Sequence, residues 1–390
     1  MEYHFPAVDP IPLPAPVWLF KLLHIVTLGL HFVAMEMLMG GLLVAVAMNV
    51  LSRREPRQLS AVNRAQTGQV IANRLPIVMT YVINLGVPPL LFTQVLYGRA
   101  IYTSSILIGL YWFAVIFLLM GCYWLLYRIS ARATEGKPYW HLGLGAWVLA
   151  VVIARIYSTN MTLMLRPEVW NALYTNSPLG AQLPFDDPTT TPRWLFILFG
   201  GFSVAGIWLL WLAPSSKFFR DLQTYMSGLG GRLAASGLFA QGVCAYWVVV
   251  AQPPAVQDAL GQSLLATVSG YLWVGLAGVL FALAVWSAVQ SQPSRIIGWA
   301  GFVMAVVAML SMTAYRDALR DVTLLTKGFD VWDRVVVTNW SVVAIFLVLF
   351  VIGLGVVGWL LTVVFKAKPV VLGLDNTIFE SKSSVEEVAK

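Results

Sequence analysis

The stretch VWLFKLLHIVTLGLHFVAMEMLMGGLLVAVAMNV, residues 17–50, decides the fold of this chain. A helix needs about 20 apolar residues to cross a hydrocarbon core that is about 30 Å thick, and this stretch is longer than that. Its only ionisable side chains are Lys21, His24, His31 and Glu36. The stretch therefore predicts a transmembrane helix that carries a few polar groups into the membrane.

Eight further stretches of similar character follow along the chain, at residues 75–97, 104–127, 139–163, 193–213, 232–251, 263–289, 296–314 and 340–365. Hydrophobic residues make up 59% of the 390 and charged residues 11%, against about 45–50% and about 25% in soluble domains. A soluble fold could not bury so much apolar surface, which excludes the soluble enzyme classes and makes the lipid bilayer a partner. We predict an all-α polytopic membrane protein with about nine transmembrane helices, located in a bacterial inner (plasma) membrane.

Lysine and arginine divide unevenly between the two alternating sets of loops that nine spans define. Most of the 25 lie in the set that begins with the loop after the first span, which carries Arg53, Arg54 and Arg57. Basic residues favour the cytoplasmic side of a membrane, so we expect the N-terminus outside the cytoplasm and the C-terminus inside. Because the net charge of +7 resides in these short loops, it indicates topology, and we expect no nucleic-acid partner.

A similar heptapeptide opens the first and the fifth span, PVWLFKL at 16–22 and PRWLFIL at 192–198. An internal duplication of this kind predicts two four-helix units in parallel orientation, followed by a ninth helix. The expected segments are an extracytoplasmic N-terminal segment 1–16, a first four-helix unit 17–163, an extracytoplasmic loop 164–192, a second four-helix unit 193–314, an extracytoplasmic loop 315–339, a ninth helix 340–365 and a cytoplasmic tail 366–390.

Ionisable groups inside the hydrocarbon are costly, so each one is a candidate functional residue. His24 and His31 are seven residues apart, which puts them on one helix face and about 10 Å apart along the axis. Arg155 in the fourth span comes to a depth similar to that of His31. We therefore expect His31, Glu36 and Arg155 to be neighbours and candidate catalytic groups, with Glu36 or a cofactor carboxylate neutralising Arg155. Lys21 would serve the outer entrance together with His24.

A histidine at this depth can be a haem ligand, a proton relay or a polar contact between helices. A haem takes its axial ligands from opposite faces, and two histidines on one helix face cannot supply both. His141 lies at the other end of the fourth span, too far from His31 to share a haem. The candidates for haem b are therefore His31 or His24 as the metal ligand, with a methionine such as Met161 or Met164 opposite His31, or with no second ligand. The chain has no Cys-x-x-Cys-His run, which argues against covalent haem c.

The second span contains amide side chains on either side of two consecutive prolines: Asn84, Pro88, Pro89 and Gln94. Prolines inside a helix free backbone carbonyls that a neighbour or a ligand must satisfy. A broken helix with amides suits a quinone headgroup, and it equally suits a structural kink.

Two runs resemble subunit I of the cytochrome bd quinol oxidases: residues 27–36, TLGLHFVAME, and residues 86–98, GVPPLLFTQVLYG. The resemblance implies nine helices and haem b, with quinone as substrate. Leu90 stands where that family has a haem-ligating glutamate, so we expect electron transfer without oxygen reduction.

A weaker resemblance, carried by residues 32–41 with their paired glycines, is to the haem-free quinone-binding membrane anchors of polysulfide and nitrite reductase type. Either resemblance implies an electron-transfer subunit that links quinone to an extracytoplasmic partner, a c-type cytochrome in the first case and an iron–sulfur subunit in the second. An ion- or proton-coupled transporter and a structural anchor without cofactor remain open alternatives.

Overall fold

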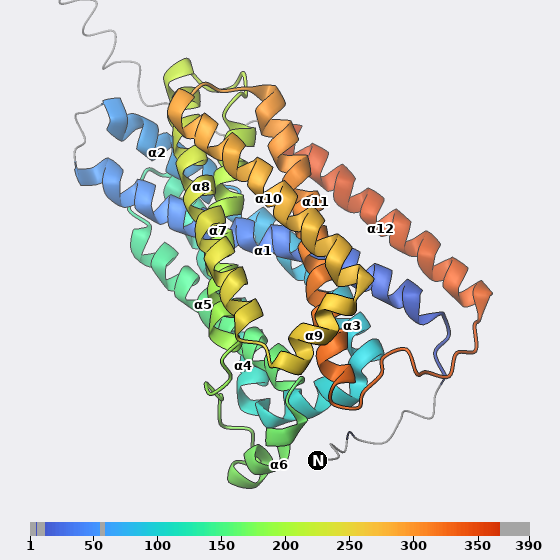
Figure 1. Ribbon diagram of the computed structural model, residues 1–390. Coiled ribbons are helices and arrows are strands. Elements are labelled where there is room, and N and C mark those ends of the chain that lie inside the picture. The colour runs from blue at the N-terminus through green and yellow to red at the C-terminus, as the bar shows by residue number, and fades with distance from the viewer. Residues whose placement is uncertain (1–4, 6–11, 55–58, 367–390) are drawn as a thin grey trace, which may run out of the picture.

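The computed structural model describes residue 5 and residues 12–54 and 59–366, and over these residues the chain is helical apart from its connections. Nine helices are long and apolar enough to cross a membrane (Figure 1). They are α1 (Val17–Arg54), α3 (Leu75–Leu107), α4 (Gly109–Thr134), α5 (Trp140–Leu163), α7 (Thr190–Leu212), α8 (Arg220–Val250), α10 (Leu264–Gln290), α11 (Arg295–Leu325) and α12 (Trp340–Lys366). The prediction of an all-helical chain with nine candidate spans is confirmed for the described residues. Most of the predicted segment 1–16, and all but the first residue of the predicted tail 366–390, lie outside them.

Three short helices complete the described part of the chain: α2 (Leu59–Ala72), α6 (Pro167–Asn176) and α9 (Pro254–Gln262). Two helices differ most from the predicted boundaries: α8 begins at Arg220 instead of residue 232, and α11 continues to Leu325 although the sequence suggested an end at residue 314. The extension carries Asp317 and Arg320, whose side chains are buried and paired. Their pairing lets the helix continue past the point where hydropathy alone ends it.

Helix α1 crosses the middle of the molecule and packs against α3, α5, α7 and α11 (Figure 1). Its closest approach to α7 is at Gly40, where an added Cβ would lie 1.7 Å from the carbonyl oxygen of Gly201. Small residues of this kind let two helix backbones come close together inside a membrane. Glycine is therefore required here to hold the central helix against α7.

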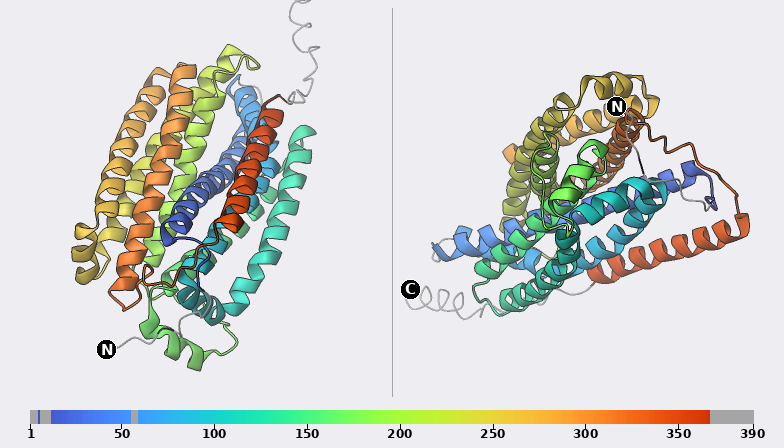
Figure 2. Two further views of the ribbon diagram at one scale, coloured as in Figure 1. Left: turned by 90° about the vertical axis from the view of Figure 1, so that its right-hand side faces the viewer. Right: turned by 90° about the horizontal axis from the view of Figure 1, so that it is seen from below.

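Helix α12 lies at the edge of the helix bundle, as the views from the side and from below show (Figure 2). Val343 of α12 packs in an apolar cluster with Leu19, Leu23 and Phe92. The segments that precede α1 and α12 are also joined, because the Leu13 N–H donates to the Val335 carbonyl at 2.9 Å. The first and last described spans therefore begin at the same end of the molecule.

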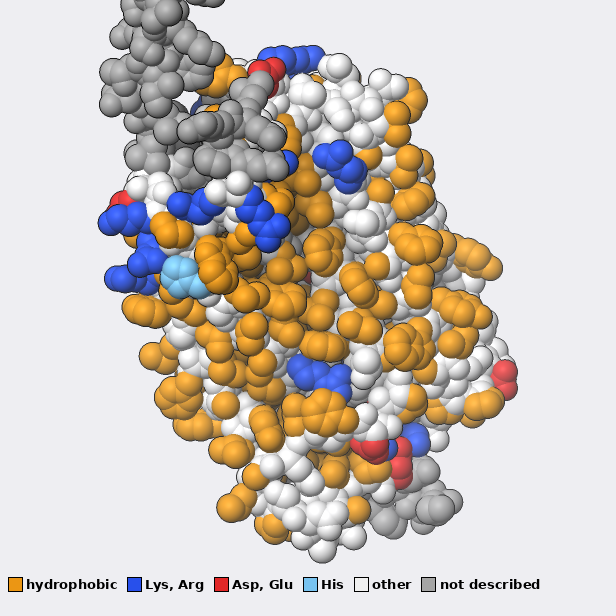
Figure 3. All heavy atoms as spheres, turned by 90° about the vertical axis from the view of Figure 1, so that its left-hand side faces the viewer, with side chains coloured by type: hydrophobic (Ala, Val, Ile, Leu, Met, Phe, Trp, Pro, Cys, Tyr) orange, Lys and Arg blue, Asp and Glu red, His pale blue; other side chains and the backbone are white. Residues whose placement is uncertain are grey.

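The surface supports a bilayer environment. Hydrophobic side chains cover the middle of the face in Figure 3, and most lysine and arginine side chains on that face gather toward its upper end. Large apolar side chains of α4 point outward, among them Phe113, Phe117 and Met120, which are each more than half exposed. Such a continuous apolar surface is unusual for a soluble monomer and typical of a protein that contacts lipid.

Candidate functional site

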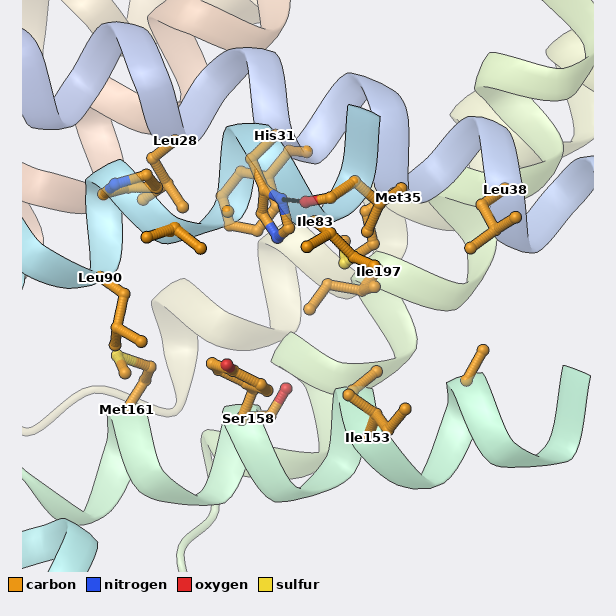
Figure 4. A pocket seen from close by; sticks show the side chains of 18 of the residues that line it. Leu28, His31, Met35, Leu38, Ile83, Leu90, Ile153, Ser158, Met161 and Ile197 are labelled. Atoms are coloured by element: carbon orange, nitrogen blue, oxygen red, sulfur yellow. Dashed lines mark hydrogen bonds between the residues drawn. The ribbon is translucent and has the colours of Figure 1, made fainter. Parts of the chain in front are cut away.

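A cavity of about 230 Å³ lies between α1, α3 and α5, with further side chains from α4, α7 and α11 (Figure 4). We call it the His31 cavity. Three of the predicted cofactor residues line it, His24, His31 and Met161. Its other lining side chains are almost all apolar and include Met35, Met39 and Met79.

The His31 ring projects from α1 into this cavity, toward Ser158 and Met161 on the facing helix α5 (Figure 4). Its Nδ1 lies 3.0 Å from the carbonyl oxygen of Val82, the bond drawn as a dashed line in Figure 4. A carbonyl only accepts hydrogen bonds, so Nδ1 carries the proton and Nε2 keeps its lone pair. Among the described residues, Nε2 has no hydrogen-bond partner, which leaves it available to a ligand.

Gly86 on α3 makes room for the His31 ring. A Cβ at this position would lie 2.8 Å from Cε1 and 2.9 Å from Nδ1 of His31. The glycine therefore allows the imidazole to lie against the α3 backbone and reach the Val82 carbonyl.

His24, seven residues before His31 on α1, also contacts a backbone carbonyl of α3, but its second ring nitrogen is not free. Its Nδ1 lies 3.1 Å from the carbonyl oxygen of Pro89, while its Nε2 accepts from Nη1 of Arg320 at 3.1 Å. Both ring nitrogens are thus engaged, and His24 holds Arg320 in place. Of the two histidines predicted as metal ligands, the geometry leaves a free nitrogen on His31.

A buried ionic cluster adjoins His24. The Lys21 ammonium lies 2.8 Å from an Asp317 carboxylate oxygen and donates to Asp321 as well. The hydroxyl of Tyr97 accepts from Lys21 at 2.7 Å and donates to Asp321 at 2.7 Å. From the sequence we predicted that Lys21 and His24 lie together. We did not predict their partners on α11, because we expected that helix to end before them. The available signal was the four-residue spacing of Asp317 and Asp321, which puts both carboxylates on one helix face.

Arg316 and Arg320 give the His31 cavity one cationic end. The Arg316 guanidinium lies 5.5 Å from the centre of the Phe32 ring. Within the described part of the chain, no carboxylate is close enough to form an ion pair with Arg316. The cavity is therefore apolar along most of its length and positively charged at the end that α11 lines.

The expected pairing of Glu36 with Arg155 does not form. The Glu36 side chain turns toward α7, where an added Cβ at Gly200 would lie 2.1 Å from its Oε1. Arg155 donates to Thr191 at 3.4 Å, and its guanidinium lies over the Phe185 ring at 4.6 Å. A similar depth in the membrane did not bring Glu36 and Arg155 into contact, because the two side chains leave their helices in different directions.

The two amides of α3 lie apart from the His31 cavity. Asn84 is exposed and donates to the Thr80 carbonyl of its own helix at 2.8 Å, and neither it nor Gln94 lines the cavity. The helix passes through both prolines, and its non-helical residue is Tyr97, with φ −123° and ψ 27°. A quinone role for Asn84 and Gln94 stays a prediction.

Comparison with models of known protein families finds no match to this chain, and no curated protein matches it either. The resemblance to the cytochrome bd quinol oxidases therefore stays a prediction. Among the described residues there is no cluster of three or more His, Cys, Asp or Glu side chains that could hold a metal ion. A haem needs only one or two ligands from the protein, and among the described residues the His31 cavity contains a histidine with a free ring nitrogen.

Proposed function

We propose that this protein is a membrane-embedded electron-transfer subunit that binds haem b through His31 and links the quinone pool to an extracytoplasmic redox partner, without reducing oxygen. The observation that carries the proposal is the His31 ring, whose Nδ1 donates to Val82 at 3.0 Å while its Nε2 faces an apolar cavity. Metal-ligating histidines almost always donate their second ring N–H to a carbonyl or carboxylate in this way.

The residues of the cavity fit a haem in three respects. His31 would hold the haem iron through its free ring nitrogen, and Met161, which lines the cavity from the facing helix, would be the candidate second ligand. The apolar lining suits the porphyrin edge, and the cationic end at Arg316 suits its carboxylates. Several methionines line the walls, and their flexible side chains can yield to a larger ligand. A bound haem b would supply one-electron transfer, and the chain would hold it, orient it and exclude water.

The proposal includes an orientation with the N-terminus outside, the C-terminus in the cytoplasm, and two four-helix units plus one helix. Packing supports the two units. Neighbouring pairs close a ring of α1, α3, α4 and α5 and a second ring of α7, α8, α10 and α11. Cysteine labelling tests the orientation, because Leu179 is 86% exposed and Phe219 is 83% exposed. In intact cells an impermeant maleimide should label Leu179→Cys and spare Phe219→Cys; the reverse pattern contradicts the orientation.

The redox partner would bind the extracytoplasmic connections, and it would be a c-type cytochrome or an iron–sulfur subunit. An ion pair between these connections supports a common surface, because the Lys327 ammonium lies 3.2 Å from Glu168 of α6. Within the connection 164–192, Arg166 lies 2.8 Å from Asp186. The hydrogen bond from Arg166 lowers the pKa of the Asp186 carboxyl.

Anaerobic reduction by a quinol tests the function. Purified protein in dodecyl maltoside, oxidised beforehand, should develop the absorption bands of reduced haem b when duroquinol is added. His31→Ala should show no such bands. His141→Ala is the control, because His141 is exposed and remote from the His31 cavity. Bands that appear with dithionite but not with the quinol would contradict the quinone link.

A further inference from the structure

A second cavity of about 100 Å³ lies beside the His31 cavity, between α1, α7, α8, α10 and α11. We call it the Glu36 cavity. Glu36, Trp273, Tyr315 and Arg193 line it and do not line the His31 cavity. The two cavities share Phe32 and Arg316, among other residues, so they are direct neighbours.

Glu36 is the most unusual group in this second cavity. Its side chain is 1% exposed, and its Oε2 has no hydrogen-bond partner among the described residues. A buried carboxyl oxygen without a partner costs several kcal/mol in general, so such a group calls for a ligand. Gly200 provides the space that the carboxyl occupies.

Aromatic rings form the walls around this carboxyl. The centre of the Trp273 ring lies 5.8 Å from that of Phe196 and 5.8 Å from that of Tyr315. Ring separations of this size are typical of favourable aromatic pairs. The walls therefore suit a flat aromatic ligand.

Two guanidinium groups complete the lining of the Glu36 cavity. Arg193 has a buried Nε without a partner among the described residues. Arg316 lies over the Phe32 ring at 5.5 Å, and no carboxylate within the described part of the chain pairs with it. Donors and an acceptor thus face one small space, which suits a ligand that carries an oxygen at each end.

The geometry points to the Glu36 cavity as the binding site for the ring of a quinol. One hydroxyl of the ring would donate to a Glu36 carboxyl oxygen, and the opposite oxygen would accept from Arg316, with the ring held against the aromatic side chains. A simple anion would leave the aromatic walls without a partner, and an alkyl chain would leave the Glu36 carboxyl unpaired. This inference rests on the proposed function, whose quinone site it assigns, and it replaces the amides of α3 with Glu36 and Arg316.

Photolabelling with an azidoquinone on the purified full-length protein tests the assignment. The label should attach to peptides that contain Val248 or Trp273, which line the Glu36 cavity alone. Attachment to peptides that contain Ile83 or Leu90, which line the His31 cavity alone, would overturn the inference.

A variant at Glu36 adds a quantitative test. Glu36→Leu removes the accepting oxygens, so it should weaken duroquinol binding, followed by tryptophan fluorescence, by roughly tenfold. Glu135→Leu, at an exposed carboxyl paired only with Lys137, should bind like the wild type. Equal affinity in Glu36→Leu and wild type would overturn the inference.

The haem spectrum of the same sample separates the two proposals. Normal haem bands with a label outside the Glu36 cavity would overturn the quinol site and leave the haem proposal standing. Absent bands with a label at Trp273 would support the quinol site and overturn the haem proposal.

Discussion

Replacing Gly86 with alanine tests how His31 is held. The new Cβ would lie 2.8 Å from Cε1 of His31, whereas carbon atoms pack at about 3.5–4.0 Å, so the ring would have to retreat by about 0.7 Å. A shift of this size weakens the 3.0 Å hydrogen bond to the Val82 carbonyl. Loss of such a supporting hydrogen bond typically costs about 10–100-fold in metal affinity. We expect haem affinity to fall by about that factor in Gly86→Ala.

The assay is a titration of haem into apoprotein from haem-deficient cells, followed by the main absorption band. Alanine favours a helix over glycine by about 1 kcal/mol, so a loss of haem affinity would not result from a weaker helix. Gly275→Ala is the matched control, because an added Cβ there meets nothing within 4 Å. If Gly86→Ala binds haem as tightly as Gly275→Ala, the role assigned to the His31 hydrogen bond is wrong.

Two further substitutions test the packing around the site, both by reversible unfolding in detergent. Lys21→Met removes the cation from a buried ionic cluster and should lower the free energy of unfolding by about 3–5 kcal/mol. Lys137→Met, at an exposed ion pair, should change it little. Equal stability of the two variants would contradict the buried cluster. Gly40→Ala places a Cβ 1.7 Å from the Gly201 carbonyl oxygen and should destabilise by about 1–3 kcal/mol through overpacking. Unchanged stability there would mean that α1 and α7 are not in close contact.

Hydropathy and charge were sufficient to predict the nine spans, because each one must match the thickness of the bilayer. They failed at the end of α11, where Asp317 and Arg320 lower the hydropathy although both side chains are buried. Hydropathy measures the free energy of moving a single residue into lipid, and it does not include the ion-pair and hydrogen-bond partners that lower this free energy. Their partners on α1 are Lys21 for Asp317 and His24 for Arg320, and each lies almost 300 positions away in the sequence.

Helical periodicity predicted that His24 and His31 share a face of α1, and the structure places both against carbonyls of α3. It could not predict which ring nitrogen stays free, because Arg320 reaches His24 from another helix. Their similar depth in the membrane likewise predicted that Glu36 and Arg155 are neighbours. The direction of each side chain around its helix, which depends on tertiary packing, separates them.

The most direct test of the central claim is the haem content of the purified full-length protein, measured with the reduced-minus-oxidised absorption spectrum. We predict haem b bands in the wild type and in His141→Ala, and their loss in His31→Ala with the helical circular dichroism unchanged. A colourless wild type, or full haem content in His31→Ala, would contradict the assignment of His31 as the ligand.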